Sequence, residues 1–122
     1  VWACDYDLDT GTPSGQRLFF DTCQIAGRPD GATVDADGCY WMAGFGGWQV
    51  VRITPDGRVD RIIEMPVERP TKVMFGGEAL DTLYVTSMGD GLADDPAQPL
   101  AGGLFAVTGL ATGGVPQARF AG

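Results

Sequence analysis

Short alternations of hydrophobic and polar residues run along the chain and are separated by turns rich in glycine and proline. Their two-residue period is typical of β-strands with one buried face. An early pair of runs, VWACDY and RLFF, flanks the turn-forming segment LDTGTPSGQ and predicts a hairpin. The later expected strands are ATVDA, CYWMAGF, QVVRI and RVDRIIEM, followed by TKVMF, TLYVTSM, GLFAVTG and PQARF. The pattern predicts an all-β fold.

Two Asp-Gly pairs, Asp37-Gly38 and Asp56-Gly57, each join two of these alternations. This is the usual position of a hairpin turn, so we interpret both pairs as structural. An EF-hand calcium loop around Asp37 is excluded, because its acidic first and twelfth positions would fall on Thr33 and Gly44.

The second series of strands repeats the first. Pro29 corresponds to Pro70 and Trp41 to Tyr84, and the Gly-Gly pair after CYWMAGF corresponds to the one before GLFAVTG, beyond an insertion. A repeat of about 40 residues with about four short strands is typical of β-propeller blades. We divide the chain into a half blade at residues 1–26, a blade at 27–67 and a last blade at 68–122.

About two and a half blades make an incomplete propeller, because a propeller closes as a ring of about four to eight blades. Such an arc exposes strand edges. The chain also starts in mid-strand without an initiating Met. We therefore expect it to be a fragment of a larger propeller, or else to self-associate through its exposed blade edges.

Composition and net charge limit the classes of partner that the chain can bind. The chain has 122 residues, of which 44% are hydrophobic and 20% charged, as expected for one soluble domain. Its net charge of −8 disfavours nucleic acid and anionic membranes, which bind clusters of Lys and Arg. No membrane span or signal peptide is evident. Cys4, Cys23 and Cys39 form no CxxC pair, so we expect packed thiols and a cytoplasmic location.

Histidine is absent from the chain. Imidazole-based triads and imidazole metal sites are thereby excluded from anything that the chain builds by itself. Any chemistry must use carboxylates, amides, hydroxyls or a metal ion with oxygen ligands.

The string GRPDGATVDADGCYWMAGFGGWQVVRITPDGRV, followed by PVERPTKVMFGG, DTLYVTS, AGGLFAV and a terminal FAG, resembles the SMP-30, gluconolactonase and regucalcin family of six-bladed propellers. The resemblance covers essentially the whole chain and corresponds to about the C-terminal two fifths of a family member. It implies a lactonase whose ring encloses one divalent cation, commonly calcium or zinc, with magnesium or manganese as alternatives.

Asp30 is the residue that the resemblance singles out. An aspartate between Pro and Gly is usually a turn residue that caps its own backbone. The family pattern instead implies that Asp30 is a metal ligand and the general base in the hydrolysis of an aldonolactone, with Gly31 packed closely beside it. The alternative interpretation of Gly31 is a turn glycine, which has a free choice of φ.

The family's other metal ligands, a glutamate and an asparagine, lie before the position of Val1, and the chain has no asparagine. We therefore expect the chain to be inactive alone. An alternative is a non-catalytic calcium-binding or scaffold propeller.

Several further residues are candidates of lower weight. Trp48 follows Gly46-Gly47 in a connection that the family places near the channel mouth, so it is a candidate substrate contact. Arg69 and Lys72 are cations that could meet a sugar acid or could simply mark a strand entry. The remaining candidates are assigned to structure: Trp41, Tyr84 and Phe105 to packing between blades, and Asp90, Asp94 and Asp95 to a solvated loop.

Overall fold

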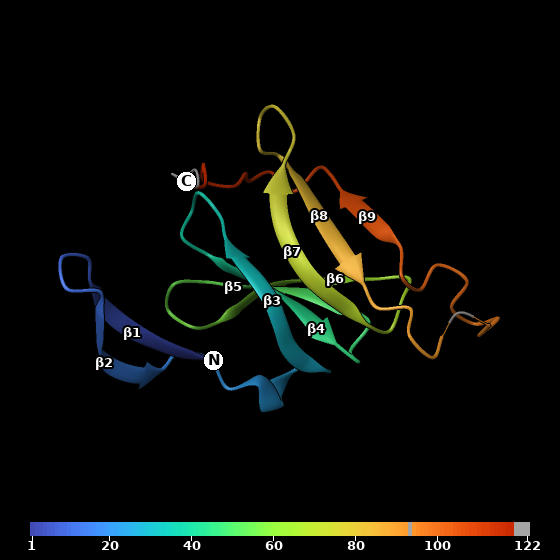
Figure 1. Ribbon diagram of the computed structural model, residues 1–122, viewed down its shortest axis with the longest axis horizontal. Coiled ribbons are helices and arrows are strands. Elements are labelled where there is room, and N and C mark those ends of the chain that lie inside the picture. Colours follow the sequence, from blue (N-terminus) through green and yellow to red (C-terminus); the bar gives the residue numbers. More distant parts are fainter. Residues whose placement is uncertain (93, 119–122) are drawn as a thin grey trace.

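The computed structural model describes residues 1–92 and 94–118, which form three separate antiparallel sheets (Figure 1). The first sheet contains β1 (Trp2–Asp7) and β2 (Thr12–Leu18). A short 3₁₀ helix, η1 (Thr22–Gln24), leads to the second. The second sheet contains β3 (Arg28–Val34), β4 (Tyr40–Phe45), β5 (Gln49–Ile53) and β6 (Val59–Glu64). The third contains β7 (Pro70–Gly76), β8 (Thr82–Ser87) and β9 (Leu104–Val107).

Each sheet is a meander whose strands pair in chain order, so the predicted all-β fold is confirmed. The first strands of the two larger sheets, β3 and β7, lie side by side (Figure 1). Within the described residues the sheets form an open arc, as expected for an incomplete propeller. The sheets fall inside the segments 1–26, 27–67 and 68–122, and the division into blades at those boundaries stays a prediction.

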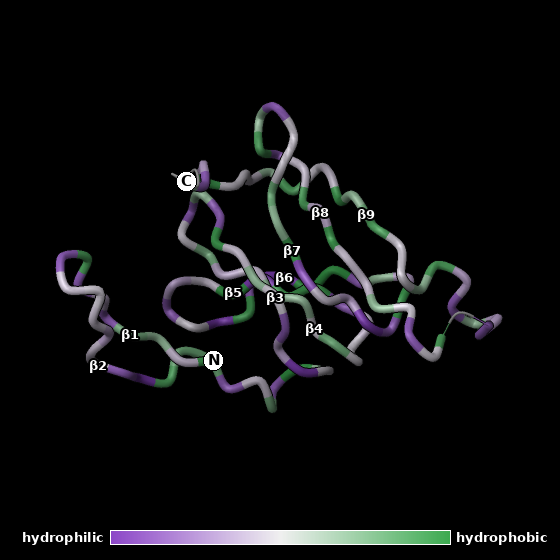
Figure 2. The backbone as a smooth tube through the Cα atoms, in the orientation of Figure 1, coloured by the Kyte–Doolittle hydropathy of each residue, from purple (hydrophilic) through white to green (hydrophobic). Residues whose placement is uncertain are grey.

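The main core lies between the second and third sheets. Trp41 on β4 meets Phe75 on β7 edge to face, with ring centroids 5.7 Å apart. Aliphatic side chains of β5, β7 and β8 surround this pair. Figure 2 shows the corresponding hydrophobic segments along β7 and β8. A smaller cluster around Met42 and Phe20 covers the opposite face of the second sheet. Because both faces of that sheet are covered, β4 and β5 are almost entirely buried.

The two Asp-Gly pairs assigned to turns do occupy turns. Gly38 closes the β3–β4 hairpin by donating to the Asp35 carbonyl, and Gly57 closes the β5–β6 hairpin by donating to the Thr54 carbonyl. Both glycines have a φ of 79°, a conformation that costs a residue with a side chain about 1–2 kcal/mol. No helix among the described residues is long and apolar enough to cross a membrane.

Two predicted strand limits were wrong. The second strand of the first hairpin starts at Thr12, inside the expected turn. It tolerates Pro13 because it is an edge strand, and Pro13 pairs in register with Tyr6. A separate register shift lies between Ala3 and Asp5. At the other end, Pro116, Gln117 and Ala118 form no strand, and the rest of the expected PQARF strand and the terminal FAG lie outside the described residues.

Two packing predictions were partly wrong. Cys39 is buried as expected, but Cys4 and Cys23 are exposed free thiols. Tyr84 is 39% exposed although Trp41 is fully buried, because no sheet covers the outer face of β8 within the described residues. Phe105 pairs with Val85, next to Tyr84 along β8, and therefore lies on the opposite face, where it packs against the main core as expected.

A buried carboxylate, Asp35, connects the strands of the second sheet. Its side chain accepts hydrogen bonds from the backbone N–H groups of Asp37 and Cys39, from Trp41 Nε1 at 2.8 Å and from Arg52 Nε at 2.8 Å. Burial, the largest influence, raises the pKa of the Asp35 carboxyl. The hydrogen bonds from Trp41, Cys39 and Arg52 outweigh burial and hold the pKa below its usual value.

Arg52 distributes its charge over three aspartates. Its guanidinium contacts Asp35 at 2.7 Å, Asp37 at 2.7 Å and Asp60 at 2.9 Å. Thr112, far along the chain, also donates to Asp37. Burial lowers the pKa of Arg52, but the hydrogen bonds to Asp60 and Asp35 raise it above its ordinary value, so the side chain stays charged. We call Asp35, Arg52, Asp37, Asp60 and Trp41 the Asp35 network.

We expect Asp35→Asn to lower the free energy of unfolding by about 2–4 kcal/mol, because it leaves buried Arg52 without its most enclosed counter-charge. The pKa of Asp35 is lower in the folded than in the unfolded state, so this stabilisation is complete above the unfolded pKa. It is lost as the pH falls through the folded pKa, and the gap between wild type and variant should therefore narrow below about pH 4.

Urea unfolding monitored by tryptophan fluorescence at several pH values would measure this gap. Asp9→Asn, in the exposed turn between β1 and β2, is the matched control and should change stability by less than about 0.5 kcal/mol. Equal stability losses in the two variants would contradict the role of the network.

Candidate active site

Asp30 lies where β3 starts, in an irregular part of the strand. Arg28 pairs with Phe45 and Pro29 with Gly44, but the register shifts before Ala32, so Asp30 and Gly31 have no regular partner on β4. A bulge of this kind redirects side chains. Asp30 is exposed and accepts no hydrogen bond from the described residues. It lines a hollow of about 290 Å³ with Arg28, Pro29 and Phe45, which we call the Asp30 hollow.

Gly31 allows β3 and β7 to approach each other. A Cβ on Gly31 would lie 2.8 Å from the Thr71 carbonyl oxygen and 2.9 Å from Lys72 Cα, and both are backbone atoms. Its φ lies outside the left-handed region. Gly31 is therefore required for close packing beside Asp30, and it lies within β3 and not in a turn.

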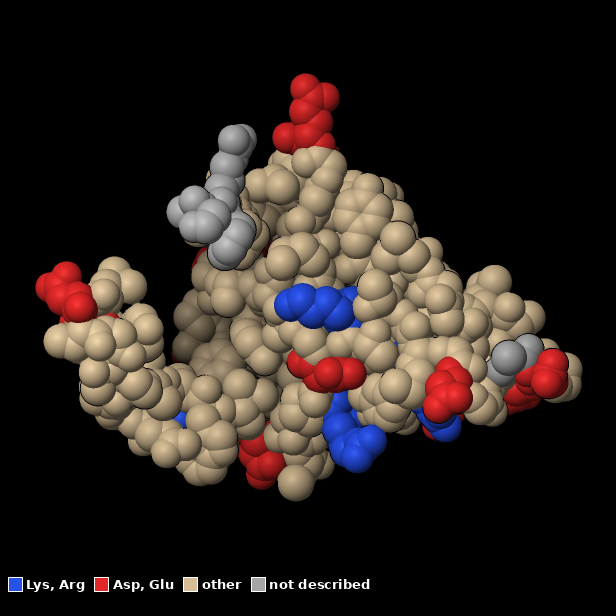
Figure 3. Space-filling model, in the orientation of Figure 1, with Lys and Arg blue, Asp and Glu red and all other residues tan. Residues whose placement is uncertain are grey.

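One cationic side chain, Arg28, lines the Asp30 hollow, and two more lie near its lining residues. The Arg28 guanidinium lies 5.3 Å from the centre of the Phe45 ring, and the Arg69 guanidinium lies 5.9 Å from the same centre. Lys72 Nζ donates to the Ala32 carbonyl, two residues after Asp30. Figure 3 shows basic and acidic side chains gathered over the starts of β3 and β7.

Trp48 lies in a different hollow. It occupies the β4–β5 turn with a φ of 57°, and its side chain is 41% exposed. With Gln49, Ile62 and Glu64, among others, it lines a space of about 660 Å³ on the side of β6. The Asp30 hollow shares no lining residue with this space, so the structure does not bring Trp48 and Asp30 into one cavity.

The acidic insertion between β8 and β9 is held by local contacts. Asp95 accepts from the backbone N–H of Ala97, and the Asp90 carbonyl accepts from Arg69. Buried Gln98 donates to Glu68 and Asp95 and accepts from the Glu68 backbone. These contacts agree with the assignment of the loop to structure.

The donor set for a metal ion is incomplete among the described residues. The carboxylate of Asp30 is a suitable hard ligand for a divalent cation. Within residues 1–92 and 94–118, however, no group of three or more Cys, Asp or Glu side chains is placed to hold a metal ion. The described residues alone therefore do not fit the three-ligand site that the resemblance implied.

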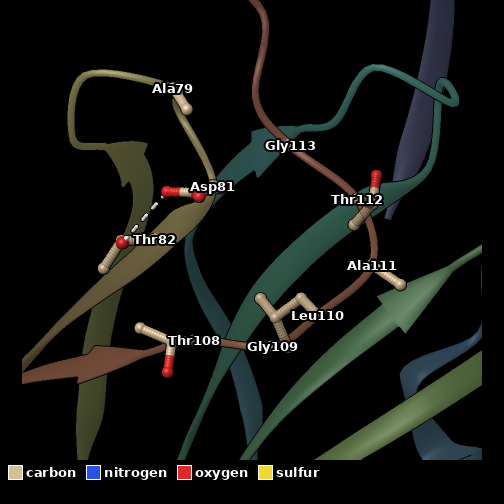
Figure 4. Close-up of a pocket in the computed structure, with 9 residues that line it drawn as sticks. All are labelled: Ala79, Asp81, Thr82, Thr108, Gly109, Leu110, Ala111, Thr112 and Gly113. Carbon is tan, nitrogen blue, oxygen red and sulfur yellow. Dashed lines mark hydrogen bonds between the residues drawn. The ribbon is translucent and has the colours of Figure 1, made fainter.

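Another hollow, of about 430 Å³, lies between the β7–β8 turn and the segment after β9 (Figure 4). Backbone, small side chains and threonine hydroxyls line most of it. Asp81 is its one ionisable residue, and that side chain accepts a hydrogen bond from Thr82. Nothing in this lining resembles a catalytic arrangement.

Phe45 and Arg28 are the site residues that sequence reasoning missed. Both are ordinary in the sequence, since one ends a hydrophobic run and the other precedes a proline. The antiparallel register that pairs them places them at the hollow. A correct β3–β4 alignment could have found them.

The three sheets resemble propeller blades, and the exposed carboxylate of Asp30 lies near the start of β3, beside β7. These features define a part of a β-propeller with a candidate site at β3 and β7. The chain belongs to the SMP-30/gluconolactonase/LRE-like region family, whose sequence profile matches residues 1–89. Regucalcin of Xenopus laevis is 38% identical over 125 residues, which cover 100% of this chain and 42% of that protein. Regucalcin of Sus scrofa is 39% identical over 127 residues.

Solved structures agree with the sequence relatives. A luciferin-regenerating enzyme superposes with a TM-score of 0.84 at 35% identity, over 93% of this chain and 39% of that one. A calcium-binding protein, regucalcin of Agrobacterium tumefaciens, gives a TM-score of 0.84 at 33% identity, over 98% of this chain and 42% of that one. The chain thus spans about two fifths of the length of the relatives that it matches.

Gly31→Ala tests the close approach of β3 and β7. We expect a loss of about 1–3 kcal/mol in the free energy of unfolding, because the new methyl group meets backbone atoms that cannot move aside. Adding Lys72→Ala removes only the flexible side-chain contact, so the double variant should be no more stable than Gly31→Ala. Chemical unfolding of both variants measures this. Full recovery in the double variant would show that the Lys72 side chain, and not the backbone, is the obstacle.

Proposed function

We propose that these residues contribute the base-bearing part of a divalent-cation-dependent lactonase, which hydrolyses an aldonolactone to the aldonic acid as a gluconolactonase does. The observation that carries this proposal is the position of Asp30. Its exposed carboxylate is held by a bulge, stands free of hydrogen bonds within the described residues and lines a hollow. Membership of the family supports the reaction class.

In the proposed reaction Asp30 is the general base. It accepts a proton from water while the water oxygen bonds to the lactone carbonyl carbon. The bond from that carbon to the ring oxygen then breaks. Asp30 returns the proton to the ring oxygen, which becomes a hydroxyl of the open-chain acid, so atoms and charge balance.

A divalent cation beside Asp30 would supply electrostatic stabilisation of the oxyanion that forms on the carbonyl oxygen. Asp30 offers one ligand, and the described residues lack the remaining donors. Calcium is supported by the description of the Agrobacterium tumefaciens relative as a calcium-binding protein. Zinc, magnesium and manganese remain alternatives.

A non-catalytic calcium-binding propeller is the second candidate, and the same description supports it. The contact of Trp48 with substrate and the self-association of the chain remain predictions. So does a cytoplasmic location, which the three free thiols support.

Asp30→Asn tests the role of Asp30 as the general base, and hydrolysis by the unaltered protein separates the two candidates. For the full-length gene product, we expect the rate of gluconolactone hydrolysis with added calcium or zinc, followed by pH-stat titration, to fall at least about 100-fold. Stability should be unchanged because the side chain is exposed. Asp94→Asn in the insertion is the control and should keep full activity.

Two results would contradict the proposal. Full hydrolysis by Asp30→Asn would remove Asp30 from the role of base, and calcium binding without any hydrolysis would favour the non-catalytic candidate. Turnover by the 122-residue chain alone would overturn the expectation that it is inactive alone.

A further inference from the structure

Among the described residues, two cations have no carboxylate partner. The chain has sixteen acidic and eight basic residues. Five arginines have a carboxylate oxygen within 3.9 Å: Arg17, Arg52, Arg58, Arg61 and Arg69. Among the described residues, Arg28 and Lys72 have no such partner. Carboxylates outnumber cations two to one in this chain, yet within its described part these two cations have no carboxylate partner. Their charges are therefore available to an anion that is not part of the chain.

Both cations lie beside Asp30. Arg28 is two residues before it and lines the same hollow. Lys72 lies on the neighbouring strand β7, with its side chain against Gly31 and its ammonium group bonded to the Ala32 carbonyl. That bond uses one of the three donors of the ammonium group and leaves two.

Arg28 makes a cation–π contact with Phe45. Its guanidinium carbon lies over the ring, 5.3 Å from the ring centre, and the Arg69 guanidinium lies 5.9 Å from the same centre while it also contacts Glu68 and the Asp90 carbonyl. The Arg28 guanidinium donates no hydrogen bond to the described residues, so its N–H groups are available to a ligand. Asp30 does not occupy the N–H groups of the Arg28 guanidinium, since no Arg28–Asp30 ion pair forms within the part of the chain that the structure describes.

We propose that Arg28 and Lys72 form a subsite for the carboxylate of a polyhydroxy acid that binds beside Asp30. The edge of Arg28 matches a carboxylate in bidentate geometry, and Lys72 adds a point charge. The sugar part of the ligand rests on the proposed function. Opening a neutral lactone creates a carboxylate, so the subsite retains the reaction product and gives product inhibition.

The test uses the 122-residue chain without metal, in the presence of EDTA. Gluconate is titrated against the ¹⁵N-labelled chain and followed by NMR, with glucitol as the matched probe that has no carboxylate and acetate as the carboxylate without hydroxyls. We expect gluconate to shift the Arg28 Nε signal and the amide signals around Asp30 and Phe45. Its affinity should exceed that of both other probes by at least about fivefold.

Charge variants then assign the residues. Arg28→Gln and Lys72→Gln should each weaken gluconate binding by about threefold to fivefold. Arg58→Gln removes an exposed arginine from the β5–β6 turn and should leave binding unchanged. Raising the salt concentration from about 20 to 200 mM should weaken binding of gluconate but not of glucitol.

Several results would overturn the proposal: no gluconate shifts near Arg28, equal binding of gluconate and glucitol, equal binding of gluconate and acetate, or equal effects of Arg28→Gln and Arg58→Gln. The readout needs neither metal nor turnover. If Asp30→Asn loses lactone hydrolysis but still binds gluconate, each of the two proposals is supported separately. If the chain binds gluconate but the full-length protein does not hydrolyse lactones, only the proposed function is contradicted.

Discussion

The contact between Asp35 and Arg52 is the interaction on which the second sheet depends. It joins the β3–β4 turn to β5, and through Asp60 and Thr112 it reaches β6 and the segment after β9. Asp35 is 1% exposed, so an unpaired charge there would be costly to desolvate. Every buried side-chain nitrogen and oxygen atom in the described residues has a hydrogen-bond partner, which is the condition under which such a network stabilises a fold.

The network and the candidate site occupy opposite ends of one strand. β3 begins at the Asp30 hollow and ends immediately before Asp35. At its end, hydrogen bonds fix the backbone and consume the charge of Asp35. At its start, a bulge leaves Asp30 exposed, and Gly31 lets β7 pass within contact distance. The residues that stabilise the fold and the residue proposed for the chemistry thus lie at opposite ends of β3. The carboxylate of Asp30 therefore need not take part in folding.

Hydrophobic alternation, turn glycines and the internal repeat predicted the strands and the hairpins, because these features are local in sequence. The Asp35 network could not be predicted this way. Arg52 lies 17 residues after Asp35 and looks like the polar position of an alternating strand. Only the register that places Trp41 opposite Arg52 brings them together. The same limit hid Phe45 and Arg28, and it misplaced Tyr84, which is exposed although the repeat aligned it with buried Trp41.

Arginine has two different environments in this acidic chain, and the contrast bears on the site. Arg52 is enclosed by three aspartates, so its charge is fully used inside the fold. Arg28 has an aromatic ring in place of carboxylates, and its charge is therefore directed to solvent at the Asp30 hollow. A chain with a net charge of −8 repels anions on average, but the potential at a hollow depends on the nearest charges, since salt screens distant ones over about 8–10 Å. Local cations beside Asp30 can thus hold an anion that the molecule as a whole disfavours.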